Sequence, residues 1–332
     1  MATAAREDHY DGDGGGIGSH QDDLVLGFRT VRSGVMGRLV RMGTTADQIL
    51  NRHDYPEAVG GALGEALVLA TLLGAPLKEG AKLILQTKTD GPLRFLVCNY
   101  ESPGRLRGYA SFDGDAVASL VSQGGGQGRL IGRGHLAMTV DPGSERDRYQ
   151  GIVGLENEPL EVAALNYFRQ SEQLPTFLKL AVARQYVAGQ GEDAGGWVWR
   201  AGGLLVQHLS PLGGGTTEAE AEAEELEMLG EEDDHWQRVR MLAETVELHE
   251  LIDPSLSADA LLFRLFGEEG VVRAVDPTPL VPHCGCSRER VTVILKTFGR
   301  DELEDMREDD GKVSVRCEFC TNEYRFDLDE IG

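Results

Sequence analysis

The sequence predicts an α+β fold, with a core domain of mixed sheet and helix, a helical linker and a small C-terminal module that contains four cysteines. Three observations predict it. β-rich runs and helical stretches follow one another from residue 24 to residue 209 without strict alternation. Apolar residues at helical spacing form two stripes between residues 236 and 265. Four of the five cysteines lie beyond residue 283.

The chain begins with a segment of low apolar content, residues 1–22, which includes the run Asp11-Gly-Asp-Gly-Gly-Gly. Such a segment cannot bury enough apolar surface to offset the entropy that ordering costs. We therefore expect a disordered tail before the first folded element.

Residues 23–210 are predicted to form the α+β core. The β-rich residues 81–86 and 93–99 flank an Asp-Gly-Pro turn and predict a hairpin. Residues 56–73 predict a helix between sheet elements. Residues 159–172 predict a second helix, because proline is favoured in a first turn and the apolar side chains that follow share one face.

An acidic segment follows the core. Residues 211–217 are rich in Gly and Thr, and Glu218 to Asp234 contains ten carboxylates and no basic residue. Gly-rich sequence is flexible, and a run of like charges is normally a solvated spacer. We predict an acidic flexible insertion over residues 211–234.

Residues 235–280 are predicted to be a helical linker. Asp253 as N-cap and Pro254 at the first helical position predict where its second helix begins. The pattern leaves two interpretations of the apolar stripes open: a permanent core, and a surface that can be uncovered. The first stripe contains Trp236, Val239, Ala243 and Val246, and the second contains Ala258, Leu261, Leu262 and Leu265.

The four C-terminal cysteines have the spacing of a metal site. Cys284 and Cys286 form a C-x-C pair, thirty residues intervene, and Cys317 and Cys320 form a C-x-x-C pair. Zinc prefers four soft ligands in a tetrahedron, and two close pairs supply them at little cost in chain entropy. We predict that these four thiolates hold one zinc ion per chain. An iron–sulfur cluster and free thiols are the alternatives.

The predicted zinc-binding module covers residues 281–332. Apolar side chains at helical spacing over residues 291–298 predict a helix with Ser287 as N-cap, and Asp301 with Glu304 predicts the cap of a second helix. A module of this size cannot build a stable core unaided, so the metal should carry its fold. Thiolates are the oxidisable form of cysteine, which permits a redox switch, although most sites of this kind are structural.

Composition excludes several classes of partner. The chain has 32 basic and 55 acidic residues and a net charge of −23, so nucleic acid is not an expected partner. The apolar stretches are shorter than the ~20 residues that cross a bilayer, and the N-terminus does not resemble a signal peptide, so we expect no membrane association and a cytoplasmic location. Cys98 ends an apolar run and is predicted to be a buried, inert thiol.

Two further functions can be weighed against the cysteine pattern. A nucleic-acid-binding zinc ribbon needs basic residues around the metal, whereas residues 300–310 are dominated by carboxylates. A thiol-disulfide oxidoreductase needs its C-x-x-C at a helix N-terminus after a strand, whereas Cys317 and Cys320 lie between strand-like runs. We also find no residues that predict an enzyme's catalytic site.

The combination of motifs resembles a known family. The C-x-C, the thirty-residue gap and the C-x-x-C at the C-terminus are similar to those of the redox-regulated holdase chaperones of the heat shock protein 33 family. The resemblance extends over residues 23–328. It includes Tyr149-Gln-Gly-Ile-Val, Tyr167-Phe-x-x-Ser-Glu-Gln-Leu-Pro-Thr, Gly202-Gly-Leu-Leu-Val-Gln and Leu261-Leu-Phe-Arg-Leu-Phe.

The resemblance implies a function and a set of site residues. It implies an ATP-independent chaperone that binds unfolded or oxidatively damaged client proteins. Oxidants such as hypochlorous acid, or peroxide with mild unfolding, are expected to form the disulfides Cys284–Cys286 and Cys317–Cys320, release the zinc and destabilise the linker. A homodimer is expected in the oxidised state. The N-terminal tail and the acidic insertion depart from the family pattern.

Overall fold

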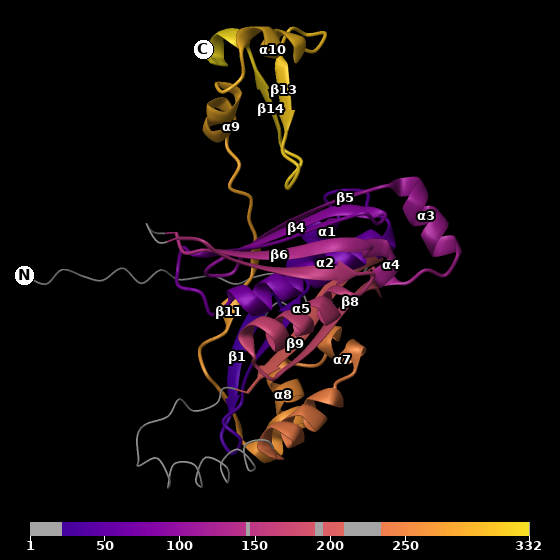
Figure 1. Ribbon diagram of the computed structural model, residues 1–332, viewed down its shortest axis with the longest axis vertical. Helices are drawn as coiled ribbons and strands as arrows, with labels where there is room; N and C mark the ends of the chain where they lie inside the picture. The colour runs from indigo at the N-terminus through magenta and orange to yellow at the C-terminus, as the bar shows by residue number, and fades with distance from the viewer. Residues whose placement is uncertain (1–21, 144–146, 190–194, 209–233, 332) are drawn as a thin grey trace, which may run out of the picture.

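The computed structural model describes residues 22–143, 147–189, 195–208 and 234–331 (Figure 1). Residues 1–21 of the predicted disordered tail and most of the predicted acidic insertion lie outside these residues. Asp22, the last residue of the predicted tail, is described and forms ion pairs with Arg41 and Arg200. Two six-stranded sheets, a group of helices and a small C-terminal module make up the described part. The α+β prediction is confirmed.

The first sheet, sheet A, has the strand order β10-β1-β2-β9-β8, and β11 also pairs with β1. The long strands β8 and β9 pair in antiparallel register from Thr176–Gln207 to Val187–Gly196. The bounds are β1 (Leu24–Thr30), β2 (Met36–Met42), β8 (Thr176–Val187), β9 (Gly196–Gln207), β10 (Val271–Arg273) and β11 (Thr278–Pro279).

The second sheet, sheet B, has the order β12-β5-β4-β3-β6-β7. Strands β3 and β4 are the predicted hairpin, paired antiparallel from Lys82–Glu101 to Lys88–Phe95. The bounds are β3 (Lys82–Thr89), β4 (Leu93–Glu101), β5 (Arg105–Phe112), β6 (Arg133–Asp141), β7 (Tyr149–Glu156) and β12 (Val281–Pro282).

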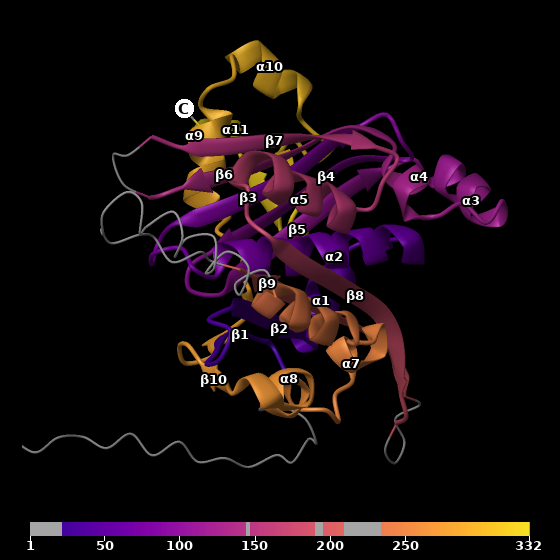
Figure 2. The same cartoon turned by 60° about the horizontal axis from the view of Figure 1, so that its bottom comes forward.

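Helix α2 (Glu57–Gly74) lies between the two sheets and contacts strands of both (Figure 2). This is the helix predicted over residues 56–73. Among the described residues it is long and apolar enough to pass a length-and-composition test for a membrane span, but 72% of it is buried inside the protein. Its side chains join those of both sheets in one apolar core, so α2 is a core helix.

The remaining core helices are short. The predicted helix over residues 159–172 is present, but only its first part is α-helical, and the rest is a single π-helical turn. Pro159 precedes the first turn as the N-cap. The bounds are α1 (Thr44–Leu50), α3 (Gly114–Ser122), α4 (Gln127–Ile131), α5 (Leu160–Tyr167) and the π-turn η1 (Phe168–Glu172).

Helical residues 234–244, α7 (Leu248–Ile252) and α8 (Ala258–Phe266) cover the face of sheet A that points away from α2. The predicted start of the second linker helix at Asp253 is wrong. Ser257 is the N-cap of α8 and accepts a hydrogen bond from the Ala260 amide, while Asp253 follows the end of α7. After the 3-10 turn η2 (Gly267–Glu269) the chain is extended.

The C-terminal module contains α9 (Arg288–Leu295), α10 (Arg300–Asp305), the hairpin β13 (Val313–Arg316) and β14 (Glu323–Phe326), and α11 (Leu328–Ile331). Ser287 caps α9 as predicted, accepting from the Arg290 amide. The predicted Asp301–Glu304 cap of α10 is wrong, because the Glu302 carboxylate accepts from the Gly299 amide instead. The strand-like runs on either side of Cys317 and Cys320 are strands that pair as a hairpin, and its turn points toward sheet B (Figure 1).

Candidate metal centre

The structure brings Cys284, Cys286, Cys317 and Cys320 together. Their Sγ atoms all lie within 4.8 Å of one another, with Cys284 and Cys317 separated by 3.7 Å and Cys286 and Cys320 by 3.2 Å. A zinc ion with four bonds of about 2.3 Å holds its sulfurs about 3.8 Å apart. The four thiols therefore have the number, chemistry and spacing that a tetrahedral metal site needs.

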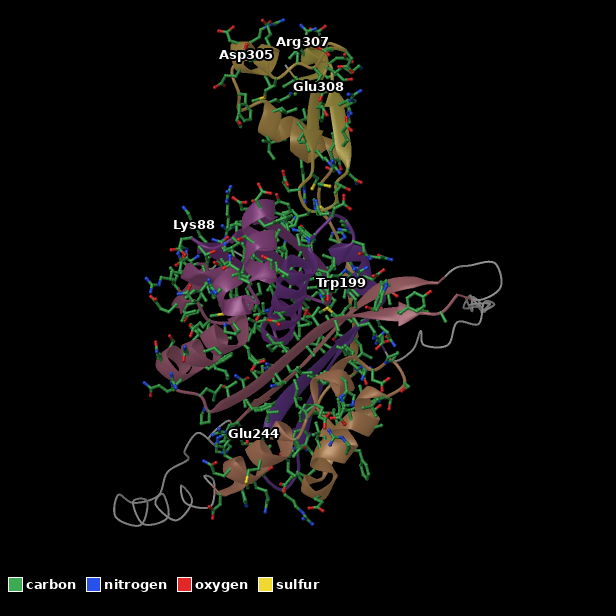
Figure 3. All side chains as sticks on the ribbon, turned by 90° about the vertical axis from the view of Figure 1, so that its right-hand side faces the viewer. Lys88, Trp199, Glu244, Asp305, Arg307 and Glu308 are labelled. Atoms are coloured by element: carbon green, nitrogen blue, oxygen red, sulfur yellow. The ribbon has the colours of Figure 1, made fainter. Side chains whose placement is uncertain are left out.

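Local structure positions both cysteine pairs. Cys284 and Cys286 lie between β12 and α9, and Cys317 and Cys320 lie in the turn of the β13–β14 hairpin. In that turn the Thr321 amide donates to the Cys317 carbonyl oxygen at 2.8 Å, and Thr321 has a left-handed φ of 61°. Figure 3 shows sulfur atoms at the end of the module that faces the core, opposite the labelled Arg307 and Glu308.

Burial and neighbouring groups set how readily the thiols of the cluster ionise. Partial burial opposes ionisation of Cys284, but hydrogen bonds from the Cys286 backbone and from neighbouring thiols bring the pKa of Cys284 to about 7. Partial burial raises the pKa of Cys317. Partial burial and the neighbouring thiols together raise the pKa of Cys320. A divalent cation would favour the thiolate form at all four positions.

The Tyr324 hydroxyl supports one of these sulfurs. It donates to Cys286 Sγ at 3.2 Å, and this hydrogen bond raises the pKa of the Tyr324 hydroxyl to about 12. A neutral hydroxyl donor favours a charged sulfur over a neutral one. Tyr324 therefore donates a hydrogen bond to one sulfur of the four-cysteine cluster.

The module around the cysteines has a small apolar core. Six side chains are buried in it, too few for a domain of this length to be stable without a further constraint. They are Val291, Leu295, Leu303, Val313, Phe326 and Ile331. Ile294 and Phe298, predicted on the same helix face, are instead 59% and 38% exposed.

The two apolar stripes of the linker are buried on sheet A. Phe266 is fully buried and its ring stacks on Phe28 with centroids 5.4 Å apart. Gly202 permits the close approach of α7, because a Cβ at this position would lie 2.2 Å from the Leu251 carbonyl oxygen. The buried linker side chains are Trp236, Val239, Ala243, Val246, Leu251, Ala258, Leu261, Leu262, Leu265 and Phe266.

Two buried arginines hold the end of α7 on the core. Arg41 donates to the Asp253 carbonyl oxygen, and Arg200 Nε donates to the Ile252 carbonyl oxygen at 2.6 Å. Asp22 accepts from both guanidinium groups, at 3.3 and 2.6 Å. Burial lowers the pKa of Arg41, and the Asp22 carboxylate opposes that effect. Charge-assisted hydrogen bonds thus reinforce the apolar contact between linker and core.

Residues 267–283, here called the strap, join the linker to the first cysteine pair. The strap pairs with β1 through β10 and β11 on sheet A, then with β5 through β12 on sheet B. Leu280 is buried and its amide donates to the Asp23 carbonyl oxygen at 2.7 Å. The strap therefore joins the four-cysteine cluster to the linker through strand pairs on both sheets.

Comparison with known proteins places the chain in a family. A family model described as Hsp33 protein matches residues 23–327. This chain belongs to the Hsp33 family. A 33 kDa chaperonin of Caulobacter vibrioides is 43% identical over 309 residues, covering 92% of this chain and 95% of the relative. A 33 kDa chaperonin of Sodalis glossinidius is 38% identical and covers 95% of each chain.

A solved structure of the Hsp33 homologue from Thermotoga maritima has the same fold. It aligns with a TM-score of 0.66 at 24% identity and covers 93% of this chain and 96% of its own. The family resemblance read from the sequence is confirmed, and this Hsp33 family member is a chaperone by relationship.

Other residues of this Hsp33 family member lie apart from the cluster. Cys98 is fully buried in the core beneath α2, and burial raises the pKa of its thiol, in agreement with the predicted inert thiol. Sequence reasoning missed Arg41, Arg200 and Tyr324. Arginines inside otherwise apolar strands were a usable signal, because a buried charge requires a partner. Tyr324 gave no signal, because its contact with Cys286 depends on hairpin register.

Proposed function

We propose that the chain is a redox-regulated, ATP-independent molecular chaperone, a holdase that binds unfolded or oxidatively damaged client proteins. In the reduced state Cys284, Cys286, Cys317 and Cys320 hold one zinc ion. The observation that carries the proposal is the physical connection between the sulfur cluster and a covered apolar face. The strap is that connection, and the linker helices cover the face.

The proposed trigger is formation of the disulfides Cys284–Cys286 and Cys317–Cys320. Each disulfide forms from two thiolates, which give two electrons to one oxidant molecule. With hypochlorous acid, the oxygen leaves as water after taking up one further proton, and the chlorine leaves as chloride. Four thiolates therefore consume two oxidant molecules, and the sulfurs can no longer act as metal ligands.

Loss of the ligand set removes the main constraint on the module. The six-residue apolar core cannot hold the module alone, so the strap loses its anchor beyond β12. The linker helices then separate from sheet A and expose apolar side chains to clients. A net charge of −23 keeps a protein with such a surface dispersed.

The remaining features of the proposal follow from the same arrangement. The chain acts in the cytoplasm, where reduced thiols are the resting state, and it holds clients without turnover as a non-enzyme. In the oxidised state the uncovered surface also permits a homodimer. The C-x-x-C lies in a hairpin turn and not at a helix N-terminus, which argues against thiol-disulfide oxidoreductase chemistry.

The test follows zinc and chaperone activity in one sample. Purified reduced protein is treated with hypochlorous acid while a chromophoric chelator reports zinc release and light scattering reports aggregation of a chemically unfolded client. We expect one zinc per chain to be released as client protection rises, and both changes to reverse with thiol reductant and added zinc. The proposal is wrong if oxidised, zinc-free protein protects clients no better than the reduced form.

A further inference from the structure

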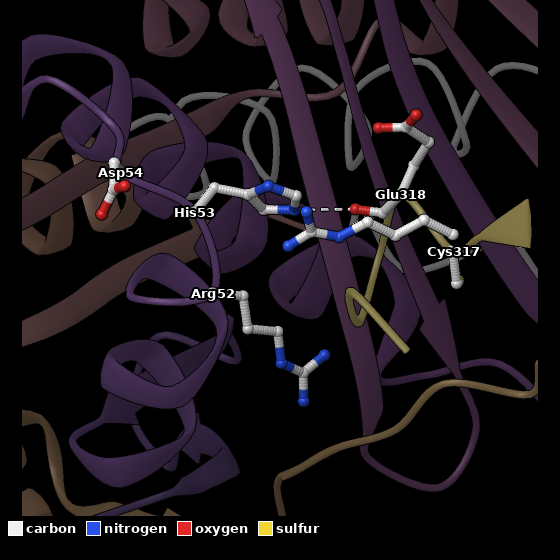
Figure 4. A pocket seen from close by; sticks show the side chains of 6 residues that line it. Arg52, His53, Asp54, Cys317 and Glu318 are labelled. Carbon is white, nitrogen blue, oxygen red and sulfur yellow. Dashed lines mark hydrogen bonds between the residues drawn. The ribbon is translucent and has the colours of Figure 1, made fainter. Parts of the chain in front are cut away.

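The turn between Cys317 and Cys320 lies directly against the core domain (Figure 4). Arg52 Nη1 donates to the Phe319 carbonyl oxygen at 3.3 Å, and His53 Nε2 donates to the Glu318 carbonyl oxygen at 2.8 Å. The guanidinium carbon of Arg107 lies 4.1 Å from the centre of the Phe319 ring. Three core side chains therefore contact Glu318 and Phe319, the two residues between the cysteines.

These core side chains are held in place before the turn reaches them. With the Asn99 amide on β4 oriented so that its oxygen faces β5, Arg107 donates from Nε and Nη2 to that oxygen at 3.0 and 2.8 Å. The His53 ring lies 5.4 Å from the Tyr109 ring in an edge arrangement. Arg52 and His53 follow Asn51, the C-cap of α1. Since their positions are fixed by sheet B and α1, they form a preorganised receptor for the turn.

We propose that Arg52, His53 and Arg107, here called the turn dock, are a second mechanical link between the metal centre and the core. The turn dock holds the Cys317–Cys320 turn in its metal-binding geometry and slows its conversion to a disulfide. This inference rests on the proposed function only in taking oxidation as the trigger. Strand β5 then anchors both cysteine pairs, one through β12 and the other through Arg107.

The geometry explains why the contact responds to the state of the sulfurs. Metal-bound sulfurs are about 3.8 Å apart, whereas disulfide sulfurs are about 2.05 Å apart. The two sulfurs draw about 1.7 Å closer when Cys317 and Cys320 join. We infer that the turn contracts with them and that the carbonyl groups of Glu318 and Phe319 reorient. Hydrogen bonds to carbonyl oxygens weaken steeply with misalignment, so a disulfide-closed turn fits the turn dock less well.

Linkage makes the effect reciprocal. Contacts with the turn dock stabilise the turn in which Cys317 and Cys320 are not joined, and they disfavour the disulfide by the same free energy. Disulfide formation in turn weakens these contacts by that free energy. A cavity of about 400 Å³, lined by Arg52, His53, Asp54, Arg316, Cys317 and Glu318, leaves room beside the turn for it to move. The turn dock thus sets a threshold for the switch independently of the strap.

The test uses the full chain, reduced and loaded with zinc. Arg107→Ala removes the cation over the ring, and Phe319→Leu keeps an apolar side chain but removes the ring face. Arg94→Ala is the matched control, because Arg94 lies on the same sheet and pairs with Asp113 at 2.6 Å. Hydrogen exchange over residues 317–322 reports docking, and quenched alkylation with mass spectrometry reports the rate of Cys317–Cys320 oxidation.

We expect Arg107→Ala and Phe319→Leu to keep one zinc per chain, to speed amide exchange in the turn and to speed oxidation about fivefold. The double variant should match the single variants, because both remove one contact. The turn dock is refuted if exchange and oxidation rates stay at the values of wild type and Arg94→Ala. Faster oxidation without any client protection would instead sustain the turn dock and overturn the proposed function.

Discussion

Replacing Phe266 by alanine should uncover the linker face of sheet A without any oxidant. Phe266 ends α8, is fully buried, and stacks on Phe28 with centroids 5.4 Å apart. Truncating a buried phenylalanine costs about 3–5 kcal/mol, which includes the cavity left behind. A loss of about 4 kcal/mol would mainly weaken the packing of α8 on sheet A, because α8 can separate from the sheet without unfolding the core. It would shift the equilibrium between packed and separated α8 by about three orders of magnitude.

The matched control lies on the same helix. Phe263 is 72% exposed, so Phe263→Ala removes the same atoms without opening a cavity in the core. Hydrogen exchange over residues 248–266 in the reduced, zinc-loaded protein measures linker docking, and light scattering measures client aggregation. We expect fast exchange and oxidant-independent client protection in Phe266→Ala, and wild-type behaviour in Phe263→Ala. Equal exchange in the two variants would refute the reasoning.

Two further predictions concern protons and metal. Burial in α2 raises the pKa of Glu65 to about 7 from a value of 4.5 in the unfolded chain. The native state therefore disfavours the charged form, and stability falls as pH rises from about 4.5 to 7, by up to about 3 kcal/mol. In urea unfolding, Glu65→Gln should reduce the difference in the free energy of unfolding between pH 5 and pH 8. The same difference in the variant and the wild type would contradict this prediction. Cys317→Ser should lower zinc content and speed proteolysis within residues 230–280 without oxidant, whereas Cys98→Ala should not change zinc content. Unchanged proteolysis in Cys317→Ser would show that the module does not restrain the linker.

The sequence correctly predicted the elements that are determined by a short run of neighbouring residues. The β3–β4 hairpin, helix α2 and the Ser287 cap of α9 each depend on a short run of residues, and each was predicted correctly. The start of α8 was predicted at Asp253, because Asp-Pro is a good helix start in isolation. Arg41 donates to the Asp253 carbonyl oxygen and Arg200 donates to the Ile252 carbonyl oxygen. These contacts hold residues 252–253 at the end of α7, and the next helix has Ser257 as its N-cap.

The sequence by itself determined the four-cysteine centre, because paired spacing brings ligands together in almost any compact arrangement of the chain between them. It also determined that two helical stripes need an apolar partner. Only the tertiary structure decided which surface that partner is, since the face of sheet A around Phe28 is assembled from strands far apart in the chain. The contact of Arg52, His53 and Arg107 with the Cys317–Cys320 turn is of the same kind. It joins residues more than 200 positions apart, and only three-dimensional packing sets such a contact.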